Sequence, residues 1–154
     1  RNVVSIMTNL ILQKRRPIIY GDGEQTRNFS DIEDCIYCLD KLITSKEILS
    51  QTFNIGPDED SITINELYKM LSNKLQFNEP AHYVKDRPNE VKHAICSSDK
   101  ARKFLDYKTS VNLSDAIDKV INFIKIKGPK KFEYNYDLEI NNKFTPETWK
   151  NKQF

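Results

Sequence analysis

The side chains with the clearest chemical potential lie in the stretch 16–29. Residues 17–20 are an apolar run that predicts a short strand. The sequence Gly21-Asp22-Gly23 predicts a tight reversal into a second strand, because glycine adopts the positive φ angles of such a turn without steric cost. This hairpin would place the aromatic ring of Tyr20 and the guanidinium of Arg27 near the same mouth. Taken alone, a single arginine is more typical of a solvated surface, and a tyrosine at a strand end is more typical of packing.

Three cysteines offer thiol chemistry, but their setting favours a structural role. Cys35 and Cys38 have the spacing of a redox or zinc half-site, yet they lie within an apolar helical pattern. No second Cys or His pair has zinc spacing, and His82 and His93 stand on other elements. Together with Cys96 they make an odd number, which suits a reducing cytosol. We therefore predict buried structural cysteines and no metal site.

Composition and charge exclude two classes of partner. The 154 residues include 24 Lys and Arg against 22 Asp and Glu, for a net charge of +2. Bulk electrostatic binding to nucleic acid or to an anionic membrane needs a marked basic excess, so neither is expected. No apolar run reaches the ~18–20 residues of a membrane helix, and no signal-peptide pattern appears, which favours a cytoplasmic location. The chain begins at Arg1 within a helical pattern, which we interpret as part of something longer.

Helices and strands are predicted to alternate, which is typical of α/β architecture. Capping boxes at Ser30–Glu33 and Thr63–Glu66 mark two helix starts. The helix after the first box should bury Ile32, Cys35, Ile36 and Leu39, with Leu42 and Ile43. The expected helices cover residues 2–14, 31–44, 63–75, 99–105 and 113–125, and the expected strands lie near residues 17–20, 51–56, 81–84 and 93–96. The strands are few and short, so this chain should complete the edge of a parallel sheet and add a small helical lobe.

Five short motifs follow one another between Arg1 and about Lys125. They are Tyr20-Gly21-Asp22-Gly23 with Arg27 and Phe29, Asp31-Ile32-Glu33-Asp34, Phe53-Asn54-Ile55-Gly56, Arg87-Pro88 with Glu90, and Ser98-Asp99-Lys100-Ala101 with Tyr107. In this order the motifs resemble the C-terminal half of the extended short-chain dehydrogenase/reductases. Within that group they are most similar to nucleotide-sugar epimerases and dehydratases, UDP-sugar 4-epimerases above all. The resemblance implies the C-terminal part of a Rossmann-like fold with a small substrate-binding lobe.

The resemblance also implies a nucleotide-sugar site. Arg27 and Arg87 would clamp the diphosphate from two directions, which suits the planar, permanently charged fork of arginine. Tyr20 and its neighbour Ile19 would lie along the nucleotide pocket, and Asn54 would hydrogen-bond to the nucleotide. The implied substrate-binding residues are therefore Arg27, Arg87, Tyr20, Asn54, Ile19 and Glu90, the last of which stands where the family usually has Asp.

The resemblance places cofactor and catalysis outside this chain. In the family a Gly-rich turn holds the NAD pyrophosphate at a helix N-terminus, whereas this chain has only four glycines, and Gly21-x-Gly23 lies in the predicted hairpin. The family's proton-transferring Tyr-x-x-x-Lys pair is expected to be absent too, since Tyr68 is followed four residues on by Ser72. We therefore expect no catalytic, cofactor-binding or metal-binding residue in this chain.

These implications define a domain organisation. Residues 1–127 are expected to be the C-terminal substrate-binding portion, and the polar, aromatic residues 128–154 an extended tail that packs on the body or on sequence outside the chain. NAD would be bound by an N-terminal domain that this chain lacks, so the fragment alone should be inactive. The full-length protein would be a homodimer that binds a UDP-sugar.

Two alternatives remain beside a UDP-sugar 4-epimerase. A nucleotide-sugar 4,6-dehydratase or a UDP-glucuronate decarboxylase would share this half. A module of another class, non-catalytic and binding, would use the basic segment Lys125–Lys131 and the aromatic tail (Phe132, Tyr134, Tyr136, Phe144 and Trp149). Interleaved lysines and aromatic rings hold single-stranded nucleic acid by stacking and phosphate contacts, but Asp137, Glu139 and Glu147 dilute this charge.

Overall fold

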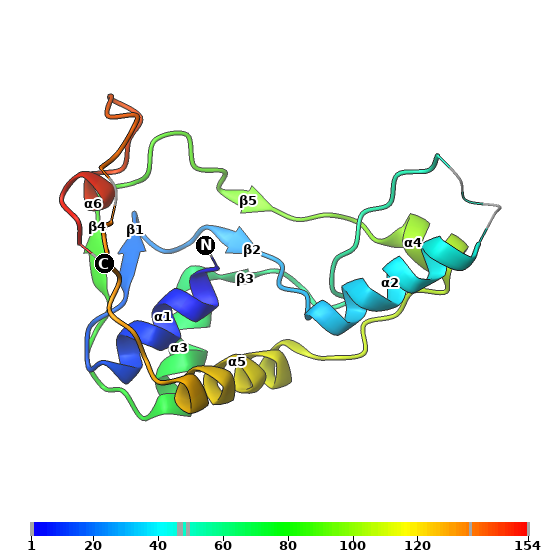
Figure 1. Cartoon of the computed structure of the whole chain (residues 1–154), viewed down its shortest axis with the longest axis horizontal. Coiled ribbons are helices and arrows are strands. Elements are labelled where there is room, and N and C mark those ends of the chain that lie inside the picture. Colours follow the sequence, from blue (N-terminus) through cyan, green and yellow to red (C-terminus); the bar gives the residue numbers. More distant parts are fainter. Residues whose placement is uncertain (1, 46–47, 49, 136, 154) are drawn as a thin grey trace. The chain divides into compact units, whose positions relative to one another are not determined.

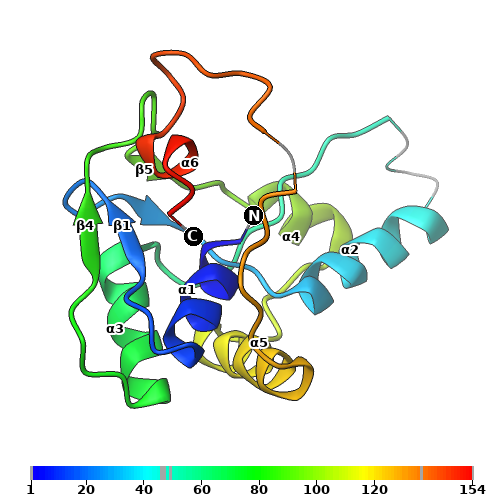
Figure 2. The same cartoon turned by 60° about the vertical axis from the view of Figure 1, so that its left-hand side comes forward.

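The computed structural model describes residues 2–45, 48, 50–135 and 137–153, so Tyr136 of the aromatic tail lies outside the described residues. Helices and short strands alternate along the chain, as Figure 1 and Figure 2 show, which confirms the α/β class with few short strands. The chain forms two compact units. Unit 1 comprises Arg1–Gln25, Thr63–Lys92 and Val120–Phe154, and unit 2 comprises Thr26–Ile62 and His93–Lys119. Within the described ranges, no helix is both long and apolar enough to cross a bilayer.

Unit 1 is built on two amphipathic helices and two paired strands. Its elements are α1 (Val3–Leu12), β1 (Ile18–Tyr20), α3 (Ile64–Leu75), β4 (His82–Val84), the end of α5 (Leu113–Lys127) and α6 (Glu147–Lys150). Helix α1 packs against α3, because each carries apolar residues three or four positions apart on one face. The buried side chains are Val4, Met7, Leu10 and Ile11 from α1 and Ile64, Leu67 and Leu71 from α3. The predicted Thr63–Glu66 capping box opens α3 and is confirmed.

Strands β1 and β4 run in parallel and in fixed register. Ile18 lies opposite His82, and Tyr20 lies opposite Val84. Arg16 reinforces the start of the pair, since Nε donates to the carbonyl of Pro80 at 2.6 Å and Nη2 to that of the next residue at 2.9 Å. The pairing therefore brings the C-terminal ends of both strands to one edge.

Unit 2 has its own small core. It contains β2 (Thr26–Arg27), α2 (Ile32–Thr44), β5 (His93–Ala94), α4 (Asp99–Leu105) and the start of α5. The first of its two segments ends at Ile62, the first residue of β3 (Ile62–Thr63). Strand β2 pairs in parallel with β5, in a sheet of order β3–β2–β5. Helix α2 packs against α4. The buried cluster consists of Cys38, Ile48, Ala101, Leu105 and Tyr107.

The prediction of which face of α2 points inward is wrong. Ile32, Ile36 and Ile43 are 66%, 55% and 84% exposed, and the buried residues of α2 are Asp34 and Cys38. The carboxylate of Asp34 accepts hydrogen bonds from both the backbone N–H and the hydroxyl of Ser110, which turns this side of the helix inward. The N-cap also differs by one residue from the predicted Ser30, because the side chain of Asp31 accepts from the Glu33 N–H at 2.9 Å.

The predicted hairpin is wrong as well, although its turn forms. Gly21 and Gly23 have φ angles of +64° and +77°. The strands on either side join different sheets, since β1 pairs with β4 and β2 with β5. The turn is attached instead to the start of α3, where the N–H of Asn65 donates to the Gly23 carbonyl at 3.1 Å. A turn sequence fixes a chain reversal, but distant segments decide which strands pair.

Gly23 has a second reason to be glycine besides its backbone angle. A Cβ at this position would lie 2.1 Å from Oδ1 of Asn65. The Asn65 amide is not free to move, because Nδ2 donates to the Asp22 carbonyl at 2.9 Å and to Oε1 of Glu24 at 2.6 Å. The hydroxyl of Tyr83 also donates to Oδ1 at 2.9 Å.

Gly23→Ala should therefore destabilise the protein more than Gly128→Ala. Gly128 has nearly the same φ, +78°, but nothing lies within 4 Å of an added Cβ. We expect Gly128→Ala to lower the free energy of unfolding by about 1–2 kcal/mol from backbone strain alone. Gly23→Ala should cost about 1–3 kcal/mol more, because Asn65 must give up hydrogen bonds. Urea unfolding of the two variants measures the difference, and equal losses would show that Asn65 moves aside freely.

Candidate functional site

An aromatic and cationic cluster forms where β1 and β4 end. Ligands of open α/β sheets bind outside the carboxyl ends of parallel strands. Three residues beyond β4, Cζ of Arg87 lies 5.1 Å from the centroid of the Tyr20 ring. Trp149 of α6, which lies beside this edge in Figure 1, has its ring centroid 5.6 Å from the same Cζ. One cation thus contacts two aromatic rings, and the three side chains come from separate parts of unit 1.

The Arg87 guanidinium retains its hydrogen-bonding capacity. Its side chain is half-buried, and among the residues that the structure describes no carboxylate, carbonyl or other acceptor pairs with it. Contacts with ring faces use the positive charge and none of the five N–H donors. A half-buried guanidinium with unused donors is suited to bind an oxyanion, and arginine binds phosphate in a bidentate manner.

A tight turn presents Arg87. The N–H of Glu90 donates to the Arg87 carbonyl at 3.3 Å, and Asn89 has a φ of +59°. Pro88 and Asn89 at the two central positions suit a type II turn, since proline fixes the first φ and asparagine tolerates a positive second one. The side chain of Glu90 is exposed.

Tyr20 is held at both its backbone and its hydroxyl. The carbonyl of Tyr20 accepts from Nε2 of Gln25 at 3.1 Å, and its hydroxyl hydrogen-bonds to the hydroxyl of Thr148, a residue only 1% exposed. The neighbouring Ile19 is 1% exposed and belongs to the core of unit 1. The ring of Tyr20, rather than its hydroxyl, is therefore the part that remains for a ligand.

Arg27 and Asn54 belong to unit 2. Arg27 is half-buried on β2, where Nη1 donates to the Thr26 carbonyl at 2.7 Å. The parallel pairing of Thr26 with His93 fixes this strand, and Oγ1 of Thr26 lies 3.0 Å from Nδ1 of that histidine. Asn54 is exposed in the short segment 53–56.

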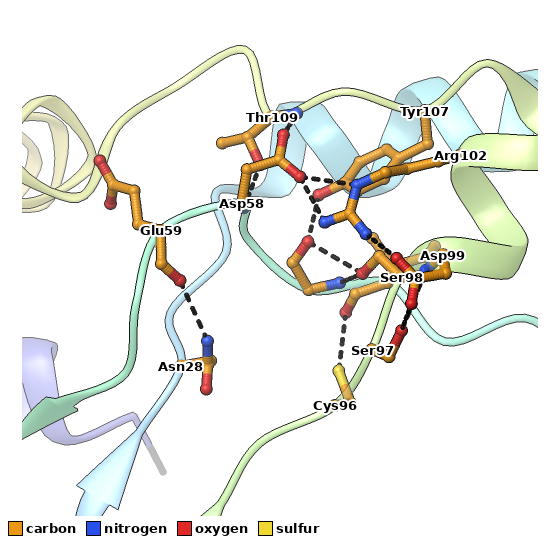
Figure 3. Close-up of polar contacts among 12 residues, drawn as sticks. Asn28, Asp58, Glu59, Cys96, Ser97, Ser98, Asp99, Arg102, Tyr107 and Thr109 are labelled. Atoms are coloured by element: carbon orange, nitrogen blue, oxygen red, sulfur yellow. Dashed lines mark hydrogen bonds and ion pairs between the residues drawn. The ribbon is translucent and has the colours of Figure 1, made fainter.

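Polar side chains clamp the segment that carries Asn54, as Figure 3 shows. The buried hydroxyl of Ser98 accepts from the Gly56 N–H at 2.6 Å and donates to the Gly56 carbonyl at 3.1 Å. The hydroxyl of Tyr107 donates to the same carbonyl at 2.7 Å. Burial raises the pKa of this tyrosine, so it stays a neutral donor at physiological pH. An added Cβ on Gly56 would lie 2.9 Å from Sγ of Cys96, so glycine is needed here.

Asp58 ties the same segment to α4. Oδ1 accepts from Nε of Arg102 at 2.9 Å, and Oδ2 accepts from the Thr109 N–H at 2.9 Å (Figure 3). The Thr109 amide and the Arg102 guanidinium hold the pKa of Asp58 below its ordinary value of 3.8. Asp99 accepts from Nη1 of Arg102 at 2.7 Å and completes an ion-pair network.

An open pocket of about 290 Å³ lies beside this clamp in unit 2. Its lining residues are Asn28, Ser30, Ile55, Gly56, Pro57, Ala94, Ile95 and Cys96. Oδ1 of Asn28 is buried without a hydrogen-bond partner among the described residues, while Nδ2 donates to the Glu59 carbonyl at 3.4 Å. The pocket therefore has an asparagine and a thiol among its lining residues.

The cysteine prediction is correct in part. Cys38 is buried and Cys35 is half-buried, and burial raises the pKa of both thiols. Cys96 is exposed and lines the pocket, so the prediction that it is buried is wrong. Sequence reasoning also missed Asn28, Thr148 and Trp149. Asn28 adjoins Arg27 in its motif and offered a signal, whereas the tail has no periodicity from which Trp149 could be singled out.

The prediction that the spacing Tyr-x-x-x-Lys is absent is wrong, because Tyr37 is followed four residues on by Lys41 on α2. Nζ of Lys41 lies 5.6 Å from the centroid of the Tyr37 ring. The Tyr37 hydroxyl lies within hydrogen-bonding distance of the carbonyls of Leu105 and Asp106, at 3.2 and 3.3 Å. These contacts link α2 to the end of α4, which is a structural role.

Comparison with known proteins shows the family to which the chain belongs. A family model for GDP-mannose 4,6 dehydratase matches residues 1–120. A Methanocaldococcus jannaschii protein provisionally named UDP-glucose 4-epimerase is 33% identical over 124 residues, which are 80% of this chain and 39% of that protein. The crystal structure of the UDP-glucuronic acid 4-epimerase of Bacillus cereus with UDP-glucuronic acid and NAD superposes with a TM-score of 0.77 at 27% identity, over 82% of this chain and 40% of that one. The UDP-glucose 4-epimerase of Thermotoga maritima shares the fold, with a TM-score of 0.77 at 24% identity, 82% of this chain and 40% of that one.

The fold and motifs are those of the extended short-chain dehydrogenase/reductases that act on nucleotide sugars. Within them, the chain belongs to the GDP-mannose 4,6-dehydratase family, as the match over residues 1–120 shows. It spans about two fifths of the length of the relatives it matches, and it corresponds to their C-terminal part.

The Gly21-x-Gly23 turn lacks the open space of the pyrophosphate-binding turn that holds NAD in enzymes of this class. A pyrophosphate needs glycines that leave open space at a helix N-terminus. The space beside Gly23 is filled by the Asn65 side chain, and that beside Gly21 by the Asp86 carboxylate, whose Oδ1 would lie 1.9 Å from an added Cβ. Neither glycine therefore leaves room for NAD.

The Asp58 network leads to a pH-dependent prediction. Because the pKa of Asp58 is lower in the folded than in the unfolded chain, its contribution is complete above about pH 4 and is lost as the pH falls below 3.8. Asp58→Asn should lower the free energy of unfolding by about 1 kcal/mol or less at pH 7, since the side chain is 42% exposed and screened by solvent. Urea unfolding at pH 7 and pH 3 should show the gap to the wild type narrowing in acid.

A double-mutant cycle supplies the control. In an Arg102→Gln background the effect of Asp58→Asn at pH 7 should shrink, because the guanidinium that pairs with the carboxylate is gone. A gap that is independent of pH and of Arg102 would contradict the assignment.

Proposed function

We propose that this chain is the nucleotide-sugar-binding part of an NAD-dependent UDP-sugar 4-epimerase, with the substrate diphosphate bound by Arg87. The observation that carries the proposal is the Arg87 guanidinium, which is half-buried between two aromatic rings and has no acceptor among the described residues. Relatives named as UDP-sugar 4-epimerases support it, as does the M. jannaschii protein at 33% identity.

Charge and geometry suit Arg87 to a diphosphate. Two phosphates carry negative charge that a guanidinium meets with paired N–H donors, and charge-assisted bonds of this kind are about twice as strong as neutral ones. The half-buried setting lowers the local dielectric and strengthens the attraction. The face of the Tyr20 ring borders the same cation, so the aromatic surface would lie along the nucleotide, with Ile19 packed behind it in the core.

Arg27 and Asn54 complete the proposed binding set, together with Glu90 at the turn after Arg87. Arg27 would supply the second cation of the diphosphate clamp. Asn54, presented by the segment that Ser98 and Tyr107 clamp at Gly56, would hydrogen-bond to the nucleotide. These residues bind and orient the substrate, and we assign no proton transfer to any of them.

Catalysis and cofactor binding are assigned to residues outside this chain. We propose that residues 1–127 form the substrate-binding portion of a longer cytoplasmic enzyme, homodimeric as the family resemblance implies, whose N-terminal domain binds NAD. NAD accepts the hydride from the sugar in this class of enzyme. A 4,6-dehydratase or a UDP-glucuronate decarboxylase would use the same binding residues, so both remain alternatives. The family model that matches the chain is itself that of GDP-mannose 4,6 dehydratase.

Substitution of the two arginines tests the binding proposal. In the protein at its natural length, Arg87→Ala and Arg27→Ala should each weaken the binding of UDP-glucose by about 1.5–3 kcal/mol, the range for hydrogen bonds to charged groups. Isothermal titration calorimetry measures the change. Titration with UDP and with GDP shows in addition which base the site prefers.

Lys85→Ala is the matched control, since Lys85 is an exposed cation two residues before Arg87. Its removal lowers the local charge equally but should change affinity by less than about 0.5 kcal/mol. Equal effects of Lys85→Ala and Arg87→Ala would indicate general electrostatics, and an unchanged affinity in Arg87→Ala would remove that residue from the site.

A further inference from the structure

The C-terminal segment, residues 128–153, folds back along unit 1. At its start, Nδ2 of Asn9 donates to the Lys130 carbonyl at 2.7 Å and the Lys130 N–H donates to Oδ1 of Asn9 at 2.9 Å. At its end, Nη2 of Arg15 donates to the Gln153 carbonyl at 3.4 Å. Between these anchors Thr145 is buried. The whole segment lies beyond residues 1–120, which the family model covers.

Two adjacent residues of this segment contact two of the proposed binding residues of unit 1, Tyr20 and Arg87. Thr148, 1% exposed, shares a hydrogen bond with the Tyr20 hydroxyl. The ring centroid of Trp149 lies 5.6 Å from Cζ of Arg87. Trp149 thus makes the same kind of contact with Arg87 as Tyr20 does, but it comes from α6, whereas Tyr20 comes from β1. Among the described aromatic residues of the tail, Phe132 packs against Tyr134, with ring centroids 4.6 Å apart, and Phe144 contacts Lys143.

We infer that Thr148 and Trp149 are positioning residues of the nucleotide-sugar site. Trp149 holds the Arg87 guanidinium in place for the diphosphate, and Thr148 holds the ring of Tyr20. This inference rests on the proposed function, because it assigns the tail a task at the same anion site.

The physical basis is preorganisation. A free arginine side chain has many rotamers, and ordering it on ligand binding costs free energy. A second aromatic ring restricts those rotamers before the ligand arrives, and it does so through the ring face, so every N–H donor stays available. The Thr148 bond acts in the same way on Tyr20, because it fixes the hydroxyl end of the ring from a buried position.

Trp149→Leu tests the inference. This change keeps an apolar side chain but removes the ring, so the dissociation constant for UDP should rise about three- to tenfold. In turnover assays of the natural-length protein with UDP-glucose, KM should rise while kcat stays unchanged. Trp149→Phe, which restores a ring face, should recover most of the affinity. Phe144→Leu is the matched control in the same segment, since Phe144 is 52% exposed and contacts Lys143 instead of the site, and it should bind UDP as the wild type does.

A double-mutant cycle separates this inference from the function it rests on. Arg87→Ala alone tests the anion site. If Arg87→Ala weakens binding and Trp149→Leu adds nothing in that background, both stand. If Arg87→Ala weakens binding but Trp149→Leu in the wild type does not, the positioning role is overturned and the proposed function remains. If Arg87→Ala has no effect, the proposed function fails and the inference with it.

A second measurement, on the unmodified chain, tests the inference even if Trp149→Leu does not fold. Trp149 is the only tryptophan in the 154-residue chain, so its fluorescence reports on this position alone. UDP should change the emission of the unmodified chain, and Arg87→Ala should abolish the change. Thr148→Val should also weaken UDP binding, with Thr148→Ser restoring it. Where Arg87→Ala shows that UDP binds at Arg87, an emission that UDP leaves unchanged, or a loss in Trp149→Leu that Trp149→Phe does not recover, would show that the tail only packs.

Discussion

The parallel pairing of β1 with β4 is the constraint on which the candidate site of unit 1 depends. The register that sets Tyr20 opposite Val84 brings Arg87, 67 positions further along the chain than Tyr20, to the same sheet edge. Arg16 supports this register through the carbonyls of Pro80 and the residue after it. The cation and the first aromatic ring then meet without any direct sequence signal linking them.

In unit 2, side-chain hydrogen bonds, and not long paired strands, fix the position of the loop at Gly56. Its strand β2 has two residues, too few to fix the neighbouring loops by ladder hydrogen bonds. Gly56 is instead held by the hydroxyls of Ser98 and Tyr107, and the carboxylate of Asp58 joins the same loop to α4. Buried polar groups that are fully paired specify one geometry, because an alternative arrangement would leave them unsatisfied.

The sequence predicted those features that depend on neighbouring residues. The Thr63–Glu66 capping box and the apolar face of α1 follow from local spacing, and both are confirmed. The hairpin prediction failed because Gly21 and Gly23 specify a reversal and not a pairing partner. The inner face of α2 was misjudged because periodicity shows that a helix has an apolar stripe, and Asp34 decides the face that turns inward here. The contact of Trp149 with Arg87 could not be predicted from the sequence. The two residues are 62 positions apart, and the tail that carries Trp149 has no periodic pattern.

The outward-facing apolar stripe of α2 has a consequence for how the chain opens. Ile36 and Ile43 contribute little burial. Helix α2 is held to its unit by Cys38 and Leu42 at the small core, by the Asp34 hydrogen bonds with Ser110, and by the Tyr37 hydroxyl at the end of α4. Helices α1 and α3 bury their apolar faces in a shared core. Local opening of α2 therefore exposes less new apolar surface than opening α1, and its backbone amides exchange with solvent through smaller fluctuations. A helix whose apolar stripe faces outward is thus expected to fray before α1 does.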